Sequence, residues 1–108
     1  MFTVQEQPNG RHAPVIVCDH CGEAVERSGT VEWLHNHAEQ AAVEGPFTLH
    51  KRCSTPFRAG RHGGEAGLPS GLLWQWWELD AYLAALVHNA RIDLVEGEWR
   101  SNLLSNDG

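Results

Sequence analysis

Cys18-Asp19-His20-Cys21-Gly22 and His50-Lys51-Arg52-Cys53 are the two stretches of this sequence that decide its fold. Each contains two metal-binding side chains separated by two residues, and together they provide three thiols and one imidazole. Structural zinc prefers such a Cys3His set, because four protein ligands close its tetrahedral shell. All three cysteines of the chain belong to the set, which leaves none for a disulfide. The sequence therefore predicts one structural zinc ion bound by Cys18, Cys21, His50 and Cys53.

The residues around the first stretch predict a strand followed by a tight turn. Pro14–Val17 is a short β-branched run that leads straight into Cys18, so we expect a strand there. Gly22 follows the second cysteine and accepts the left-handed backbone conformation of a turn whose amides face the thiolates. A Cys-x-x-Cys-Gly turn of this kind is commonly called a zinc knuckle.

The residues between the two stretches predict a β-hairpin with a long connection. Thr30–Leu34 and Phe47–Leu49 have the composition of strands and would form its two arms. Ala38–Val43, between them, favours helix by propensity. After the second arm, His50 and Cys53 share one face of a helical turn, which Pro56 keeps short.

This order of knuckle, hairpin and helix start resembles a treble-clef zinc finger over about residues 15–58. The resemblance implies that Cys18 and Cys21 are the knuckle pair of ligands. It implies that His50 and Cys53 are the helix pair and that the zinc is structural. It does not extend to the C-terminal part of the chain.

The apolar residues beyond Leu72 recur at steps of four and three, which predicts one amphipathic helix. The glycine-rich segment before it is typical of a linker, and Ser70 suits the helix N-cap. We therefore expect an α+β protein in which a small treble-clef-like module is followed by one long amphipathic helix. Its parts would be a flexible arm (1–14), the zinc module (15–62), a linker (63–71), the helix packed on the module (72–94) and a tail (95–108).

The tryptophans of the expected helix indicate an interaction surface. Trp74, Trp76 and Trp77 cannot all face one core at helical spacing. We take Trp74 and Trp77 as the candidate interface, through which the 72–90 helix would bind a protein partner or a second copy of the chain.

Charge is unevenly distributed along the chain. The net charge is -6, yet Lys51, Arg52, Arg58 and Arg61 lie in a window without any acidic residue. These side chains would balance the charge of a three-thiolate zinc site, or would contact phosphates or a partner. Nucleic-acid binding through residues 51–61 is thus an alternative function, which the acidity of the whole chain disfavours.

Two further alternatives concern Cys18 and Cys21. A thiol redox protein would continue from the motif into a long helix, whereas Glu23–Gly29 is short and polar. Catalytic zinc needs an open coordination position, which four protein ligands remove, so we expect no enzyme. No apolar stretch is long enough to span a bilayer, and the thiols suit a reducing cytoplasm. The favoured interpretation is a non-enzymatic, cytoplasmic zinc protein with an interaction or regulatory role.

Overall fold

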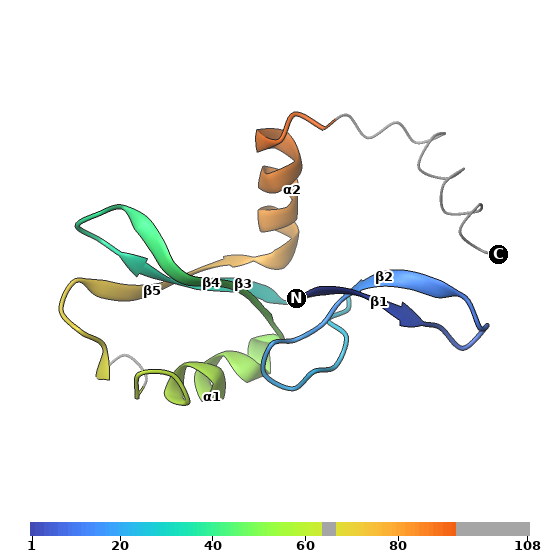
Figure 1. Cartoon of the computed structure of the whole chain (residues 1–108), viewed down its shortest axis with the longest axis horizontal. Helices are drawn as coiled ribbons and strands as arrows, with labels where there is room; N and C mark the ends of the chain where they lie inside the picture. The colour runs from blue at the N-terminus through green and yellow to red at the C-terminus, as the bar shows by residue number, and fades with distance from the viewer. Residues whose placement is uncertain (64–66, 93–108) are drawn as a thin grey trace.

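The computed structural model describes residues 1–63 and 67–92, which form a small α+β protein (Figure 1). Two antiparallel sheets are present in this part of the chain, with strand orders β1-β2 and β4-β3-β5. Within the same residues, no helix combines the length and apolar character needed to cross a membrane. The elements in chain order are β1 (Phe2–Glu6), β2 (His12–Ile16), β3 (Thr30–Asn36), β4 (Ala41–Leu49), the 3-10 turn η1 (Lys51–Cys53), α1 (Ser54–Ala59), β5 (Leu72–Glu78) and α2 (Leu79–Asn89).

The prediction of one long amphipathic helix from residue 72 is wrong. Residues 72–78 form strand β5, and α2 begins only at Leu79. Strand β5 pairs with β3 in an unbroken antiparallel register from Thr30↔Glu78 to Asn36↔Leu72. Alternate residues of this Trp- and Leu-rich run share one face of a strand as readily as residues four apart share one face of a helix. Pairing with β3 decides between the two patterns. Residues 93–94 of the expected helix and the tail over 95–108 lie outside the described residues.

A β-hairpin takes the place of the arm expected over residues 1–14. Strands β1 and β2 pair from Phe2↔Ile16 to Glu6↔His12. The turn between them contains Gly10 with φ 82°, and the Gln7 N–H donates to the Arg11 carbonyl at 2.6 Å. Pro-Asn-Gly between two alternating segments is a turn signal, so this hairpin has a local cause in the sequence.

The expected strands at 14–17, 30–34 and 47–49 fall on or beside β2, β3 and β4, whereas the helix favoured over Ala38–Val43 does not form. A turn with Gln40 at φ 53° leads instead into β4, which pairs with β3. Sheet pairing therefore overrides the helix propensity of this segment.

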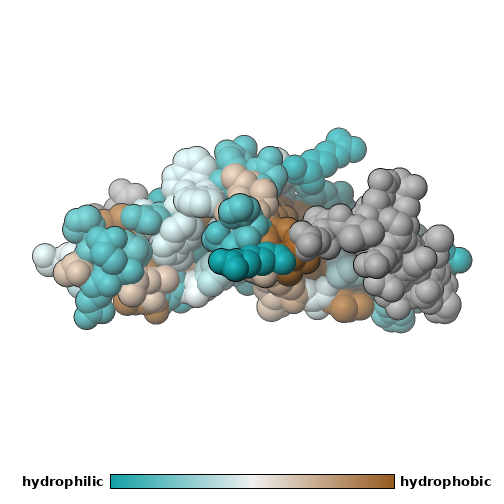
Figure 2. Space-filling view, turned by 90° about the horizontal axis from the view of Figure 1, so that it is seen from above, coloured by the Kyte–Doolittle hydropathy of each residue, from teal (hydrophilic) through white to brown (hydrophobic). Residues whose placement is uncertain are grey.

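The three-stranded sheet separates α1 from α2 (Figure 1). On the α1 side, Phe57 contacts Phe47 of β4 and Trp74 of β5, with ring centroids 4.9 and 6.3 Å apart. On the α2 side, Tyr82 lies against Trp33 and Trp77. Apolar surface is visible near the middle of the α2 side between hydrophilic residues (Figure 2). The buried core contains Cys18, Val25, Val31, Leu34, Leu49, Cys53, Phe57, Trp74 and Leu79.

Candidate metal centre

The structure brings Cys18, Cys21, His50 and Cys53 together, although they come from two separate parts of the chain. Their ligand atoms all lie within 4.8 Å of one another. The His50 Nδ1 atom is 3.3 Å from Cys21 Sγ and 4.0 Å from Cys53 Sγ. A tetrahedral zinc ion with Zn–S bonds of about 2.3 Å separates its ligand atoms by about 3.5–3.8 Å. The cluster therefore has the dimensions of a four-ligand metal site.

The imidazole of His50 is oriented as in a metal-binding histidine. Its Nε2 lies 2.8 Å from the carbonyl oxygen of Ala24. A carbonyl oxygen only accepts hydrogen bonds, so Nε2 carries the proton and donates it. The lone pair of Nδ1 is then directed at the sulfur atoms. A hydrogen bond from the ring nitrogen that does not face the metal fixes the tautomer and the ring orientation of histidine ligands.

The first ligand pair lies in a turn of the expected knuckle type. The His20 N–H donates to Cys18 Sγ at 3.4 Å, and the Gly22 N–H donates to the Cys18 carbonyl at 2.9 Å. Gly22 adopts φ 79°, a conformation in which a side chain would be strained. The His20 ring lies 6.3 Å from Phe57 in an edge-to-face arrangement and is not part of the ligand cluster.

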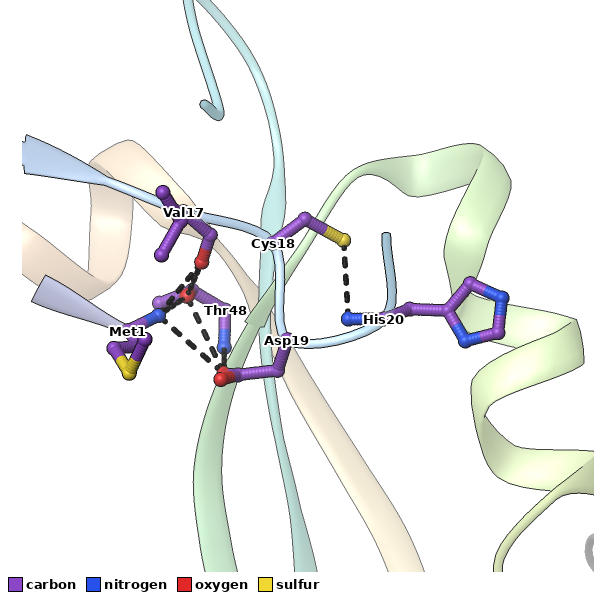
Figure 3. Close-up of polar contacts among 6 residues, drawn as sticks. All are labelled: Met1, Val17, Cys18, Asp19, His20 and Thr48. Carbon is purple, nitrogen blue, oxygen red and sulfur yellow. Dashed lines mark hydrogen bonds and ion pairs between the residues drawn. The ribbon is translucent and has the colours of Figure 1, made fainter. Parts of the chain in front are cut away.

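Asp19, between Cys18 and Cys21, joins this turn to strand β4, which ends at Leu49 directly before His50 (Figure 3). The Thr48 N–H donates to Asp19 Oδ2 at 2.8 Å, and the Asp19 N–H donates to the Thr48 carbonyl at 2.8 Å. The Thr48 hydroxyl donates to the Val17 carbonyl at 2.7 Å. The Met1 amino group reaches the same place, donating to the Val17 carbonyl at 2.7 Å and contacting Asp19 and the Thr48 hydroxyl. These bonds hold both ligand stretches in register without involving a thiol.

A buried carboxylate, Glu32 of β3, positions the helix that follows Cys53. Glu32 is 1% exposed and accepts hydrogen bonds from Arg58 Nε at 2.7 Å, the Ser54 hydroxyl at 2.9 Å and the Thr30 hydroxyl at 2.7 Å. Ser54 and Arg58 belong to α1, so this group joins the helix to the sheet. The sequence reasoning missed Glu32 and Asp19. An acidic residue inside an otherwise buried strand, or inside a knuckle, is the local signal that could have indicated them.

The thiols of the cluster have unequal pKa values. Burial raises the pKa of Cys18, but hydrogen bonds from the backbone N–H groups of Cys21, His50 and His20 outweigh burial and lower it to about 6. Burial, followed by interactions with the sulfur atoms of Cys18 and Cys21, raises the pKa of Cys53 to about 11. Neighbouring thiolates repel each other, so a bound cation would favour the ionised form of these thiols.

Metal affinity is expected to rise with pH. Between the pKa of Cys18, about 6, and that of Cys53, about 11, the metal-free chain holds a thiolate at Cys18 and a proton on Cys53. A metal must displace that proton, which alone increases the apparent affinity about tenfold for each pH unit. Below the Cys18 pKa the metal must also displace the Cys18 proton, which makes the dependence steeper. Competition with a chromophoric chelator over roughly pH 5.5–8 measures this slope. An affinity independent of pH would contradict thiolate ligation.

The four basic side chains of the 51–61 window each have a glutamate partner. Lys51 lies 3.0 Å from Glu78, Arg52 lies 4.0 Å from Glu23, Arg58 lies 2.7 Å from Glu32 and Arg61 lies 2.9 Å from Glu44. A hydrogen bond from His62 and, less strongly, one from Arg61 lower the pKa of Glu44 against the effect of burial. The window that the sequence indicates as a phosphate-binding candidate is thus a set of ion pairs.

The two tryptophans taken as the candidate interface have different environments. Trp74 is 7% exposed and belongs to the core. Trp77 is 46% exposed, and Trp76, on the other face of β5, is 52% exposed. The solvent-accessible tryptophan surface of β5 therefore comes mainly from Trp76 and Trp77.

Comparison of the chain with protein-family models, curated proteins and solved structures finds no match. The chemistry of the cluster itself is therefore what indicates a function. Three sulfur atoms and one imidazole nitrogen suit zinc and other soft or borderline cations, whereas magnesium and calcium prefer oxygen ligands. The site defines a candidate Cys3His metal-binding centre.

Proposed function

We propose that this protein is a non-enzymatic zinc-binding module whose single structural zinc organises a surface for protein binding or regulation. The observation that carries the proposal is the inward-facing Nδ1 of His50, with three cysteine sulfur atoms within 4.8 Å and the opposite nitrogen bonded to Ala24. Three thiolates and one neutral imidazole would surround the ion and leave no position for a substrate or a catalytic water.

The order of elements supports a treble-clef arrangement around this ion. The knuckle follows β2, the hairpin of β3 and β4 comes next, and η1 and α1 follow with the last two ligands at their start. The ion would thus connect the knuckle, the end of β4 and α1. Few large side chains are fully buried in the described residues, so such a connection would contribute strongly to stability.

The environment of the basic window favours protein binding over nucleic-acid binding. A side chain already paired with a glutamate must give up that partner before it can contact a phosphate, which reduces the gain from counterion release. The chain also has a net charge of -6. The exposed tryptophans of β5 instead resemble the aromatic residues enriched at protein interfaces. The cluster of free thiols suits a reducing compartment such as the cytoplasm.

Metal analysis of the purified protein tests the proposal. We expect one zinc ion per chain, and we expect cobalt substitution to give the absorption of a tetrahedral site with sulfur ligands. A cobalt-loaded His50→Ala variant should keep the sulfur-to-cobalt absorption, because the three thiolates remain. The d–d bands of its cobalt ion should shift, because one ligand has changed. Purified chains that contain no metal, and that bind neither zinc nor cobalt under reducing conditions, would refute the proposal.

A further inference from the structure

We propose that the outer edge of β5 pairs with β5 of a second copy of this chain, so that two three-stranded sheets become one. This inference rests on the proposed binding role and makes it more specific, because it names the binding surface and the partner. Strand β5 lies at an edge of its sheet, with β3 on one side (Figure 1).

The hydrogen bonds at the two ends of β5 show which backbone groups face outward. The His37 N–H donates to the Gly71 carbonyl, and the Leu79 N–H donates to the Gly29 carbonyl, each at 2.9 Å. Residues bonded to a neighbouring antiparallel strand alternate, so 73, 75 and 77 also bond to β3. The N–H and C=O groups of Trp74 and Trp76 therefore point away from β3. In the part of the chain that the structure describes, no backbone hydrogen bond reaches these groups.

The two edges of the sheet differ in how well they are protected against pairing. The β4 edge contains Pro46 and the charged Glu44, and its register with β3 is irregular on either side of Leu34. Proline, charge and irregular pairing are the usual devices that block an edge. Residues 72–77 of β5 contain no proline and no charge, and their register with β3 is unbroken. The β5 edge is thus the one suited to accept another strand.

A second copy fits this edge because β5 is self-complementary. Antiparallel pairing about a two-fold axis at Gln75 sets Trp74 opposite Trp76 of the other copy, as a hydrogen-bonded pair. It sets Leu73 opposite Trp77 of the other copy, and both of these side chains are exposed in the single chain, by 37% and 46%. Cross-strand aromatic and aliphatic pairs of this kind stabilise sheets.

Charge also favours a second copy despite the acidity of the chain. The strand's charged residue, Glu78, is paired with Lys51 of the same chain at 3.0 Å. In the proposed register Glu78 faces Leu72 of the other copy, so no like charges meet between the two paired strands. Lys51 lies between the ligands His50 and Cys53, which places the paired edge beside the metal centre.

Charged substitutions of Gln75, at the two-fold axis, test this inference. Gln75 would face itself across a non-hydrogen-bonded pair, with Cα atoms about 4.5 Å apart. Sedimentation of the zinc-loaded protein should show dimers forming over ~1 to ~100 μM, the range of a small interface. Gln75→Lys and Gln75→Glu should each be monomeric, because like charges meet at the axis. An equimolar mixture of the two variants should associate again. Val43→Lys and Val43→Glu, on the β4 edge, are the matched controls and should dimerise like the wild type.

Hydrogen exchange of the wild-type chain gives a second readout that needs no variant. The outward-facing amides of Trp74 and Trp76 should gain protection as the protein concentration rises, whereas Gln75 and Trp77 should be protected throughout. A wild-type chain that holds one zinc ion and remains monomeric at ~100 μM would overturn the dimer and leave the zinc proposal intact. Monomeric single variants that fail to associate when mixed would overturn the proposed pairing, whereas a chain without zinc would overturn the proposed function itself.

Discussion

Replacing Cys53 with serine is expected to remove the zinc ion and to unfold most of residues 17–59. The side chain of Cys53 is 6% exposed and lies in the same core cluster as Phe57 and Leu49. A serine hydroxyl does not replace a thiolate at zinc, and structural zinc contributes about 10–16 kcal/mol of apparent binding free energy. A typical domain is stable by only about 5–15 kcal/mol in total, so losing the zinc ion removes a free energy comparable to the whole stability of the protein. Metal analysis, circular dichroism and thermal unfolding of the variant measure the loss.

His20 provides the control for this experiment. It lies between Cys18 and Cys21 but outside the ligand cluster, and its side chain is exposed. A His20→Asn variant should therefore keep one zinc ion per chain and unfold close to the wild-type temperature. If Cys53→Ser also unfolded at that temperature, or kept its zinc, Cys53 would not be a ligand and the centre would have to be assigned differently.

The Cys3His cluster could be predicted from the sequence because its information is local. Two residues between the members of each pair allow both to reach one ion from a single turn, whatever the rest of the fold. Thiols and imidazole also define the kind of cation. The distance between Cys21 and His50 in the sequence did not matter, since the hairpin of β3 and β4 returns the chain to the knuckle.

Segment 72–89 could not be predicted correctly because its apolar residues fit two periods at once. Leu72, Trp76 and Leu79 follow helical steps, while Leu72, Trp74 and Trp76 follow strand alternation. Residues 72–78 become a strand because they pair with β3. The sequence of the segment itself does not show that this pairing partner is available. The register with β3 ends at Thr30↔Glu78, beyond which the Leu79 N–H donates to the Gly29 carbonyl, and the same apolar pattern continues as α2.

The hydrogen bonds of Glu32 and Asp19 could not be predicted from the sequence for a related reason. Glu32 and Arg58 are far apart in the sequence, as are Asp19 and Thr48, and an isolated acidic residue does not indicate its partner. Only once the strands are paired and α1 is placed does the burial of Glu32 become apparent.

Replacing Glu32 with leucine is expected to destabilise the protein by about 3–5 kcal/mol, the usual cost of breaking a buried ion pair from one side. Glu32 is 1% exposed at its side chain and Arg58 is 17% exposed, so this ion pair is largely shielded from water. The hydroxyls of Thr30 and Ser54 lose the same acceptor. Denaturant unfolding of the zinc-loaded protein measures this free energy, and Glu23→Leu serves as the control. Glu23 is 78% exposed and pairs with Arg52 at 4.0 Å, so its loss should matter little.

The double variant Glu32→Leu/Arg58→Met distinguishes a charge effect from a packing effect. When both partners of a buried pair become apolar, no charge is left buried, and the cost of desolvating the pair disappears as well. The double variant should therefore recover most of the stability that Glu32→Leu loses, while still binding one zinc ion. If it were less stable than the single variant, the carboxylate would contribute mainly by shape and by its bonds to Thr30 and Ser54. In that case the connection between α1 and the sheet would depend on hydroxyl hydrogen bonds rather than on the ion pair.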